Sequence, residues 1–164
     1  MLIKANKMNT IILFWKPEIS SIKFEDFQEC IQNAEIDTMN WSVWEHEKAK
    51  KGDRFFLVKC GNTKNNGICM SGYFVSDPWQ GEDWSGKGRE VYYMDMSIDV
   101  AINPQFFPIL PTTDLQSAIP DFDWTGGHSG RILPTREASL LEEIWDYFLE
   151  KHSFIFEPQS YRKL

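Results

Sequence analysis

Cysteine is scarce in this chain, and its spacing is not that of a disulfide framework or a zinc site. The 164 residues contain three cysteines, Cys30, Cys60 and Cys69. An odd number of cysteines without a C-x-x-C pair is typical of a protein whose thiols stay reduced. The sequence therefore predicts a cytoplasmic location and no metal site built from cysteine.

Long apolar runs are also absent from the N-terminal region. Only five consecutive apolar residues, 11–15, precede Lys16 and Pro17. A signal-peptide core or a membrane span needs a longer run, so we expect no membrane partner. The segment before Met8 reads as a dispensable start. The predicted division is a lead-in at residues 1–8 and a single domain at residues 9–164.

Motifs of catalysis and nucleotide binding are missing as well. GNTKNNG (61–67) lacks the Gly-Lys-Ser/Thr ending of a phosphate-binding loop. GGHSG (126–130) does not fit G-x-S-x-G, because the fifth residue counted from Gly127 is Arg131. The histidines, His46, His128 and His152, have no second ligand at metal-binding spacing. The sequence therefore predicts no catalytic residue, no cofactor and no metal.

One enzymatic alternative stays open in the loop 121–130. Asp121, Asp123 and His128 lie close together there. A pair of carboxylates can hold a hard cation, although Asp residues around a proline more often cap turns. The alternative is a small metal-assisted nuclease.

The charge balance is acidic, with one basic stretch. The net charge is −7, whereas proteins that grip duplex phosphates without selectivity are usually basic. Residues 48–64 run against this trend, with six basic side chains against Asp53 alone: Lys48, Lys50, Lys51, Arg54, Lys59 and Lys64. This stretch is either a solvated face or a contact surface for an anionic partner.

Aromatic residues are plentiful, and several of the seven tryptophans stand among turn-forming residues. Trp41 and Trp44 precede an apolar run, Trp79 and Trp84 fall within 77–88, and Trp124 falls within 121–130. Aromatic side chains dominate core packing, so each of these alone is compatible with packing. Flat rings beside polar residues are also what a planar ligand needs.

Hydrophobic patterning predicts several short strands and few helices. We expect strands at 10–15, 54–60, 67–76, 89–102 and 132–133, and helices at 22–33, 115–119 and 136–151. Gly72 inside a strand indicates a bulge, a barrel corner or a close neighbour. The last helix carries an apolar stripe formed by Leu140, Leu141, Ile144, Trp145 and Phe148. This pattern favours an α+β fold: a small mixed or antiparallel β-barrel of five or six strands with flanking helices.

An ordered set of segments resembles a known family. FWKPE (14–18), WSVWEHEKAKKGDRFFLVKCG (41–61), NNGICMSGYFVSDPW (65–79), YYMDMSIDV (92–100) and SGRILPTREASLLEEIW (129–145) together resemble the EVE domain of the PUA-like superfamily. The most similar versions are those attached to HNH nucleases and McrB-type restriction proteins. The resemblance covers nearly the whole chain after Met8.

The resemblance implies a PUA-like barrel that reads a modified base. In such domains the base is typically a methylated or hydroxymethylated cytosine flipped from DNA, and the related YTH branch reads methylated adenine in RNA through an aromatic cage. Mapped onto this chain, the base-binding residues are Trp15, Trp41, Ser42, Val43, Trp124, Ser129 and Gly130. Trp79 and Trp84 are additional aromatic candidates.

The basic stretch then supplies the phosphate contacts, through Lys48, Lys50, Lys51 and Arg54. We expect Trp41 in the pocket and Trp44 in the adjoining core. The chain departs from the family at one place. The segment Glu45-His46-Glu47 is acidic, whereas many EVE domains carry an Arg-rich, Asn-containing stretch at this position. The expected partners are DNA or RNA with a modified base and a separate nuclease or other effector protein. A scaffold whose exposed aromatics bind another protein is the remaining alternative.

Overall fold

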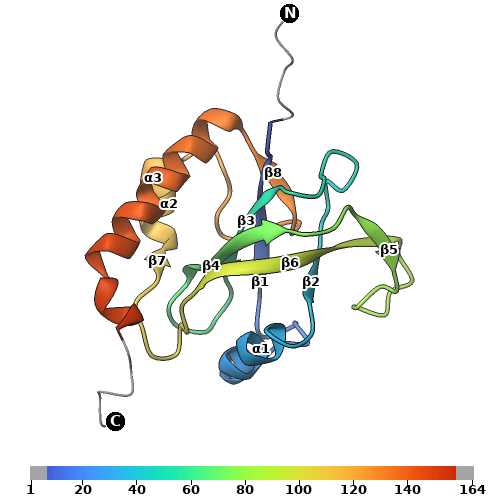
Figure 1. Ribbon diagram of the computed structural model, residues 1–164, viewed down its shortest axis with the longest axis horizontal. Helices are drawn as coiled ribbons and strands as arrows, with labels where there is room; N and C mark the ends of the chain where they lie inside the picture. The colour runs from blue at the N-terminus through green and yellow to red at the C-terminus, as the bar shows by residue number, and fades with distance from the viewer. Residues whose placement is uncertain (1–6, 158–164) are drawn as a thin grey trace, which may run out of the picture.

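A strongly curled β-sheet with helices on its outside forms the molecule (Figure 1). The computed structural model describes residues 7–157. The strands are β1 (Thr10–Trp15), β2 (Met39–Ser42), β3 (Arg54–Lys59), β4 (Gly67–Phe74), β5 (Trp79–Gly81), β6 (Val91–Ala101), β7 (Leu110–Pro111) and β8 (Arg131–Leu133). The helices are α1 (Phe27–Ala34), α2 (Thr112–Ala118) and α3 (Thr135–Lys151), with 3-10 turns η1 (Phe24–Asp26) and η2 (Ser153–Phe156).

The sheet is mixed, and its strand order is β2-β6-β4-β3-β1-β8. β1 and β3 run parallel, whereas the other pairs are antiparallel. The short strands β5 and β7 add to β6 and β4. The predicted α+β barrel with flanking helices is confirmed.

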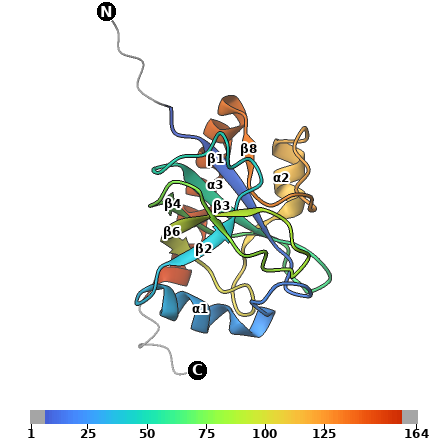
Figure 2. The same ribbon diagram turned by 90° about the vertical axis from the view of Figure 1, so that its right-hand side faces the viewer.

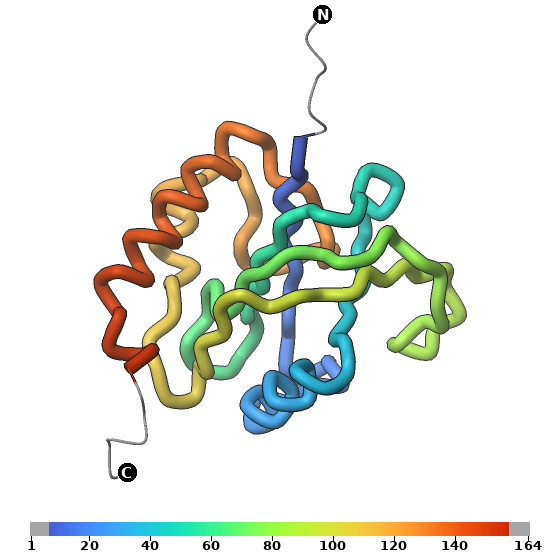
Figure 3. The backbone as a smooth tube through the Cα atoms, viewed as in Figure 1, coloured from blue at the N-terminus to red at the C-terminus, as the bar shows by residue number. Residues whose placement is uncertain are grey.

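Main-chain hydrogen bonds bring the two ends of this sheet together. The chain after β2 meets the chain before β8, where Trp44 N donates to Ser129 O and Glu45 N donates to Gly130 O, both at 2.9 Å. The two segments can be followed in cyan and orange in Figure 3. Gly130 has φ +98°, and a Cβ on it would lie 2.4 Å from Val43 Cα. The closure therefore requires glycine at this position.

The core lies inside the curl, and α3 seals one side of it. All six residues of β1 and of β3 are buried, including Arg54 and Lys59 at the two ends of β3, because both faces of these strands are covered. From α3, Leu141, Trp145 and Phe148 pack inward. Figure 2 shows α1 below the barrel, well away from α2. Of the other two residues of the predicted stripe, Ile144 is partly buried, and Leu140 is 38% exposed.

The long predicted strands are present with small shifts at their ends, and Gly72 has the expected role. The pairing of β4 with β6 shifts register between Ser71 and Gly72, and a Cβ on Gly72 would lie 2.6 Å from the Phe55 ring. Gly72 is therefore both a bulge and a close approach. Patterning missed β2, β5 and β7.

The three cysteines are free. Burial raises the pKa of Cys69 to about 12, so this thiol stays protonated and unreactive at physiological pH. Within residues 7–157 no helix is both long and apolar enough to cross a membrane.

Candidate functional site

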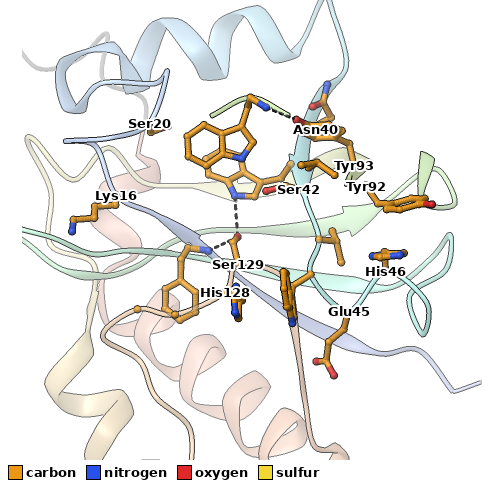
Figure 4. Close-up of a pocket in the computed structure, with 18 of the residues that line it drawn as sticks. Lys16, Ser20, Asn40, Ser42, Glu45, His46, Tyr92, Tyr93, His128 and Ser129 are labelled. Carbon is orange, nitrogen blue, oxygen red and sulfur yellow. Dashed lines mark hydrogen bonds between the residues drawn. The ribbon is translucent and has the colours of Figure 1, made fainter. Parts of the chain in front are cut away.

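A cavity of about 1060 Å³ opens next to the barrel closure (Figure 4). Its walls come from β2, the start of β6, the chain after β1 and the loop before β8. Figure 4 shows Lys16 and Ser20 on one side, Asn40, Ser42 and Tyr93 on the other, and Ser129 with His128 between them. The cavity thus lies where β2 separates from the segments that close the barrel.

The outer edge of β2 gives this cavity main-chain polar groups. Val43 N donates to Tyr92 O at 2.8 Å, which fixes the alternation along the antiparallel pair of β2 and β6. In such a pair every second residue turns its N–H and C=O away from the partner strand. Ser42 and Asn40 are those residues, and both line the cavity.

Ser129 holds the centre of the site. Its Oγ accepts hydrogen bonds from Phe14 N at 2.9 Å and from Trp41 Nε1 at 3.1 Å. A serine hydroxyl has two acceptor positions and one donor. Both acceptor positions are filled, and no atom of residues 7–157 accepts the hydroxyl proton. Ser129 is therefore a hydrogen-bond donor toward whatever occupies the cavity.

Three indoles line this cavity: Trp41, Trp44 and Trp84. No aromatic ring of residues 7–157 stacks on Trp41 or on Trp84. Trp84 is 50% exposed, and its loop is well ordered by hydrogen bonds. The Tyr93 hydroxyl accepts from Trp84 N at 3.1 Å and donates to Glu82 O. Trp41 is partly buried against the core, so the part of each ring that lines the cavity is what a planar ligand can contact.

Asp83 organises the turn that carries Trp84. Its carboxylate accepts from Ser85 Oγ at 2.6 Å, from Ser85 N at 2.9 Å and from Arg89 Nε at 3.2 Å. The Ser85 side chain, with further help from its main chain and Arg89, holds the pKa of Asp83 well below its ordinary value. The turn therefore keeps its charge network at any physiological pH.

Two histidines stack on aromatic rings at the rim of the cavity. Trp44 and His128 lie 3.6 Å apart with an interplanar angle of 3°, and His46 and Tyr92 lie 3.8 Å apart at 10°. The expectation that Trp44 belongs to the core is wrong: its side chain is 56% exposed. The turn that follows β2 carries this ring out to the rim, where His128 covers one of its faces.

Two of the expected pocket tryptophans are core residues instead. Trp15 is 1% exposed, and its Nε1 donates to Ile22 O at 2.9 Å. Trp124 is 0% exposed, and its Nε1 donates to Ile119 O at 2.9 Å. Neither ring reaches the cavity, so the assignment of both to base binding is wrong. A buried indole with its N–H satisfied is what core packing requires.

The remaining expected residues divide between cavity, closure and surface. Trp41, Ser42, Val43 and Ser129 line the cavity, and Gly130 closes the barrel behind it. Trp79 lies outside, where its Nε1 donates to Asp95 Oδ1 at 3.1 Å.

The basic stretch contributes less charge to the site than its composition suggests. Arg54 is buried, 2.9 Å from Asp99 and 3.1 Å from Glu142. Burial alone would lower the pKa of Arg54, but these two carboxylates outweigh it and raise the pKa. The expectation that Arg54 binds phosphate is therefore wrong. Lys59 is also buried, with its ammonium 2.6 Å from Lys64 O.

Of the other three expected phosphate contacts, Lys48 alone lines the cavity. Lys50 is held by Asp53 at 3.2 Å, and Lys51 is exposed away from the cavity. Sequence reasoning missed Lys16 and Arg89, which also line the cavity. The sequence Asp-Trp-Ser before Arg89 could have indicated a fixed turn at this place, because Asp with a following Ser favours turns.

The acidic loop 121–130 is organised as a turn. Asp123 Oδ1 accepts from Thr125 Oγ1 at 2.6 Å and from Thr125 N at 3.0 Å, which lowers the pKa of Asp123. His128 is engaged by Trp44. Residues 7–157 contain no group of three or more His, Cys, Asp or Glu side chains that could hold a metal ion.

No protein-family model and no curated protein sequence matches this chain. Solved structures do. A YTH domain-containing protein mmi1 in an RNA complex has a TM-score of 0.54 at 15% identity, covering 88% of this chain and 85% of that chain. Rpa0253 from Rhodopseudomonas palustris has a TM-score of 0.56 at 13% identity, covering 88% and 98%. The Mmi1 YTH domain alone has 0.56 at 14% identity, covering 90% and 81%. These similarities show that the chain has the fold of YTH domains.

Proposed function

We propose that this protein is a nucleic-acid-binding module that reads a modified base turned into the cavity. The observation that carries the proposal is the fixed position of Trp41, whose indole is locked by Ser129 beside the open edge of β2. One wall thus combines a flat apolar face with directed polar groups, which is the arrangement that a planar heterocycle needs. The RNA complex of the similar mmi1 domain supports the same class of ligand.

The energetics favour a site with two rings. Extruding a base costs a few kcal/mol of lost pairing and stacking, whereas one aromatic platform returns about 1–3 kcal/mol per base. Trp41 alone would roughly balance that cost. Stacking on Trp84 and hydrogen bonds to the polar groups supply the further free energy that makes binding favourable.

The polar groups define which base edge is read. Ser129 offers a donor, and the main chain of Ser42 offers a donor and an acceptor. Cytosine carries acceptors at N3 and O2 and a donor at N4, so its edge can satisfy these groups. Together with the EVE resemblance, this favours methylated or hydroxymethylated cytosine in DNA or RNA. We also propose that a separate nuclease or other effector acts on the bound nucleic acid.

The cationic groups at the rim would contact the flanking phosphates. Lys16 and Lys48 come from two different segments around the opening, whereas Arg89, which also lines it, is engaged by Asp83 at 3.2 Å. The nearest carboxylate to Lys48 lies 4.0 Å away, which is a weak surface pair. Lys48 can therefore exchange this carboxylate for a phosphate at little cost in free energy.

The test is a binding titration with oligonucleotides that carry cytosine, 5-methylcytosine, 5-hydroxymethylcytosine or N6-methyladenine. The expected result is a preference for a modified base that Trp41→Ala abolishes. Tyr147→Ala is the matched control, because Tyr147 is an exposed aromatic residue on α3 and does not line the cavity. Absence of binding to all four at high micromolar protein in low salt would show that the proposal is wrong for these bases.

A further inference from the structure

The ring of Trp44 has one covered face and one open face. His128 lies parallel to it at 3.6 Å, which removes water from one side of the indole. The side chain nevertheless remains 56% exposed. The exposure must therefore come mainly from the opposite face and the edges, which are turned to solvent at the rim.

This platform is fixed next to the cavity. Trp44 N donates to Ser129 O at 2.9 Å, while Trp41 Nε1 donates to Ser129 Oγ at 3.1 Å. Both residues are therefore bonded to the same serine, Trp41 through its indole and Trp44 through its main chain, and both line the cavity. His128 is held in turn, because Arg131 Nε donates to His128 O at 3.1 Å. A surface that is ordered before binding loses little conformational entropy when a ligand arrives.

We propose that Trp44, backed by His128, is a second stacking subsite for the base adjacent to the one in the cavity. The subsite rests on the proposed function, and it narrows the ligand to a single-stranded segment of at least two nucleotides. In a duplex the neighbouring base stays paired and stacked in the helix, so it cannot also lie on Trp44. In a single strand it is free to stack on an aromatic ring, and such stacking is tolerant of sequence.

The turn that carries Trp44 holds charges of both signs: Glu45 and Glu47 line the opening as Lys48 does, and Glu45 accepts a hydrogen bond from Ile132 N. Lys48 lies in the same turn as Trp44. Lys48 lines the opening of the cavity, and so does Lys16, which follows β1. A phosphate that joins the two bases would lie between these cations. Because phosphate contacts carry no base identity, they position the strand while the two rings take the bases.

The experiment compares three probes by titration monitored with NMR. They are a modified nucleoside, a dinucleotide in which it has a neighbouring base, and the same dinucleotide with an abasic neighbour. Both 5-methylcytosine and N6-methyladenine series are used, with the neighbour on either side. The neighbouring base can stand on the 5′ or the 3′ side of the modified base. For the wild-type protein we expect the dinucleotide with the neighbour on one of these sides to bind roughly 5- to 150-fold more tightly than the nucleoside, which is the gain that one stacked base provides. The abasic probe should lose this gain.

The variants separate the two sites. Trp44→Ala should remove the gain of the dinucleotide while leaving nucleoside affinity within about twofold, and Trp44→Phe should keep most of the gain because it keeps a ring. Tyr147→Ala, an exposed change on α3 outside the cavity, should change nothing, and Trp41→Ala should abolish binding of every probe. A full dinucleotide gain in Trp44→Ala would overturn the subsite alone. Failure of every probe to bind the wild type would overturn the proposed function, and the subsite with it.

A comparison with a duplex tests whether the ligand must be single-stranded. A duplex with the same modified base should bind more weakly than the single strand of identical sequence. Equal or tighter binding of the duplex would overturn the single-strand inference.

Discussion

The Trp41 indole donates to the Ser129 hydroxyl at 3.1 Å across 88 residues of sequence. The same hydroxyl accepts from Phe14 N at 2.9 Å. One small side chain thus joins β2, the end of β1 and the segment before β8, and it fixes the plane of the cavity's main aromatic ring.

Ser129→Ala should therefore weaken both fold and recognition. Removing the hydroxyl leaves the Phe14 and Trp41 N–H groups without their acceptor, which should lower the free energy of unfolding by about 1–3 kcal/mol. Preference for a modified base should fall as well, because the indole loses its fixed orientation. Urea unfolding and the oligonucleotide titration measure the two effects. Ser42→Ala is the control for stability, and its free energy of unfolding should stay within about 0.5 kcal/mol.

Gly130→Ala should break the barrel closure. The added Cβ would lie 2.4 Å from Val43 Cα, at a backbone φ of +98°. Gly52 is a matched control, because its φ is +95° and nothing lies within 4 Å of its added Cβ. Gly52→Ala should cost about 1 kcal/mol from the left-handed backbone alone. Gly130→Ala should cost clearly more, and equal losses in thermal unfolding would mean that the close approach is not needed.

Arg54→Ala should destabilise the protein without a direct effect on nucleic-acid binding. The guanidinium bridges Asp99 on β6 and Glu142 on α3, so its loss should lower the free energy of unfolding by about 1.5–3 kcal/mol, the range for hydrogen bonds to charged groups. Lys51→Ala serves as the exposed control. The folded fraction of Arg54→Ala should bind oligonucleotides like the wild type; a specific loss of affinity would restore Arg54 as a phosphate contact.

The elements that sequence predicted well are those whose burial is continuous along the chain. The centres of β1 and β3 are continuous apolar runs, and the stripe of α3 repeats with the helical period, so local pattern was enough. β2, β5 and β7 have four, three and two residues. Their strand character depends on distant partners, which a local pattern cannot contain.

The errors at the site have the same origin. The resemblance maps Trp15 and Trp124 onto the pocket, and Trp44 is expected in the core, but the direction of each ring is set by distant packing. Arg54 looked available because its two carboxylates lie 45 and 88 residues away. Trp41 and Ser129 were placed together by the family resemblance rather than by any local signal.

Trp145→Ala should be the most damaging change in α3. The ring is fully buried against Phe56 and Phe148, and its Nε1 donates to Ser71 Oγ at 3.1 Å. Deleting a large core aromatic costs about 3–5 kcal/mol. Leu140→Ala on the same helix should cost much less, because Leu140 is partly exposed. Similar losses for both variants in urea unfolding would mean that α3 does not seal the core in this orientation.

The lysines nearest the cavity should set the salt dependence of binding, whereas others of the basic stretch should not. Lys16 and Lys48 line the opening, but Lys50 Nζ is engaged by Asp53 at 3.2 Å and by Lys7 O at 2.7 Å. Each lost phosphate contact reduces the slope of log K against log salt by about 0.7–0.9. Lys16→Ala and Lys48→Ala should each flatten the slope by roughly this amount for modified and unmodified oligonucleotides alike. Lys50→Ala should leave the slope of its folded fraction unchanged, because that ammonium is already occupied. A flatter slope in Lys50→Ala, with none in Lys16→Ala or Lys48→Ala, would place the strand across the 48–64 segment instead of the cavity mouth.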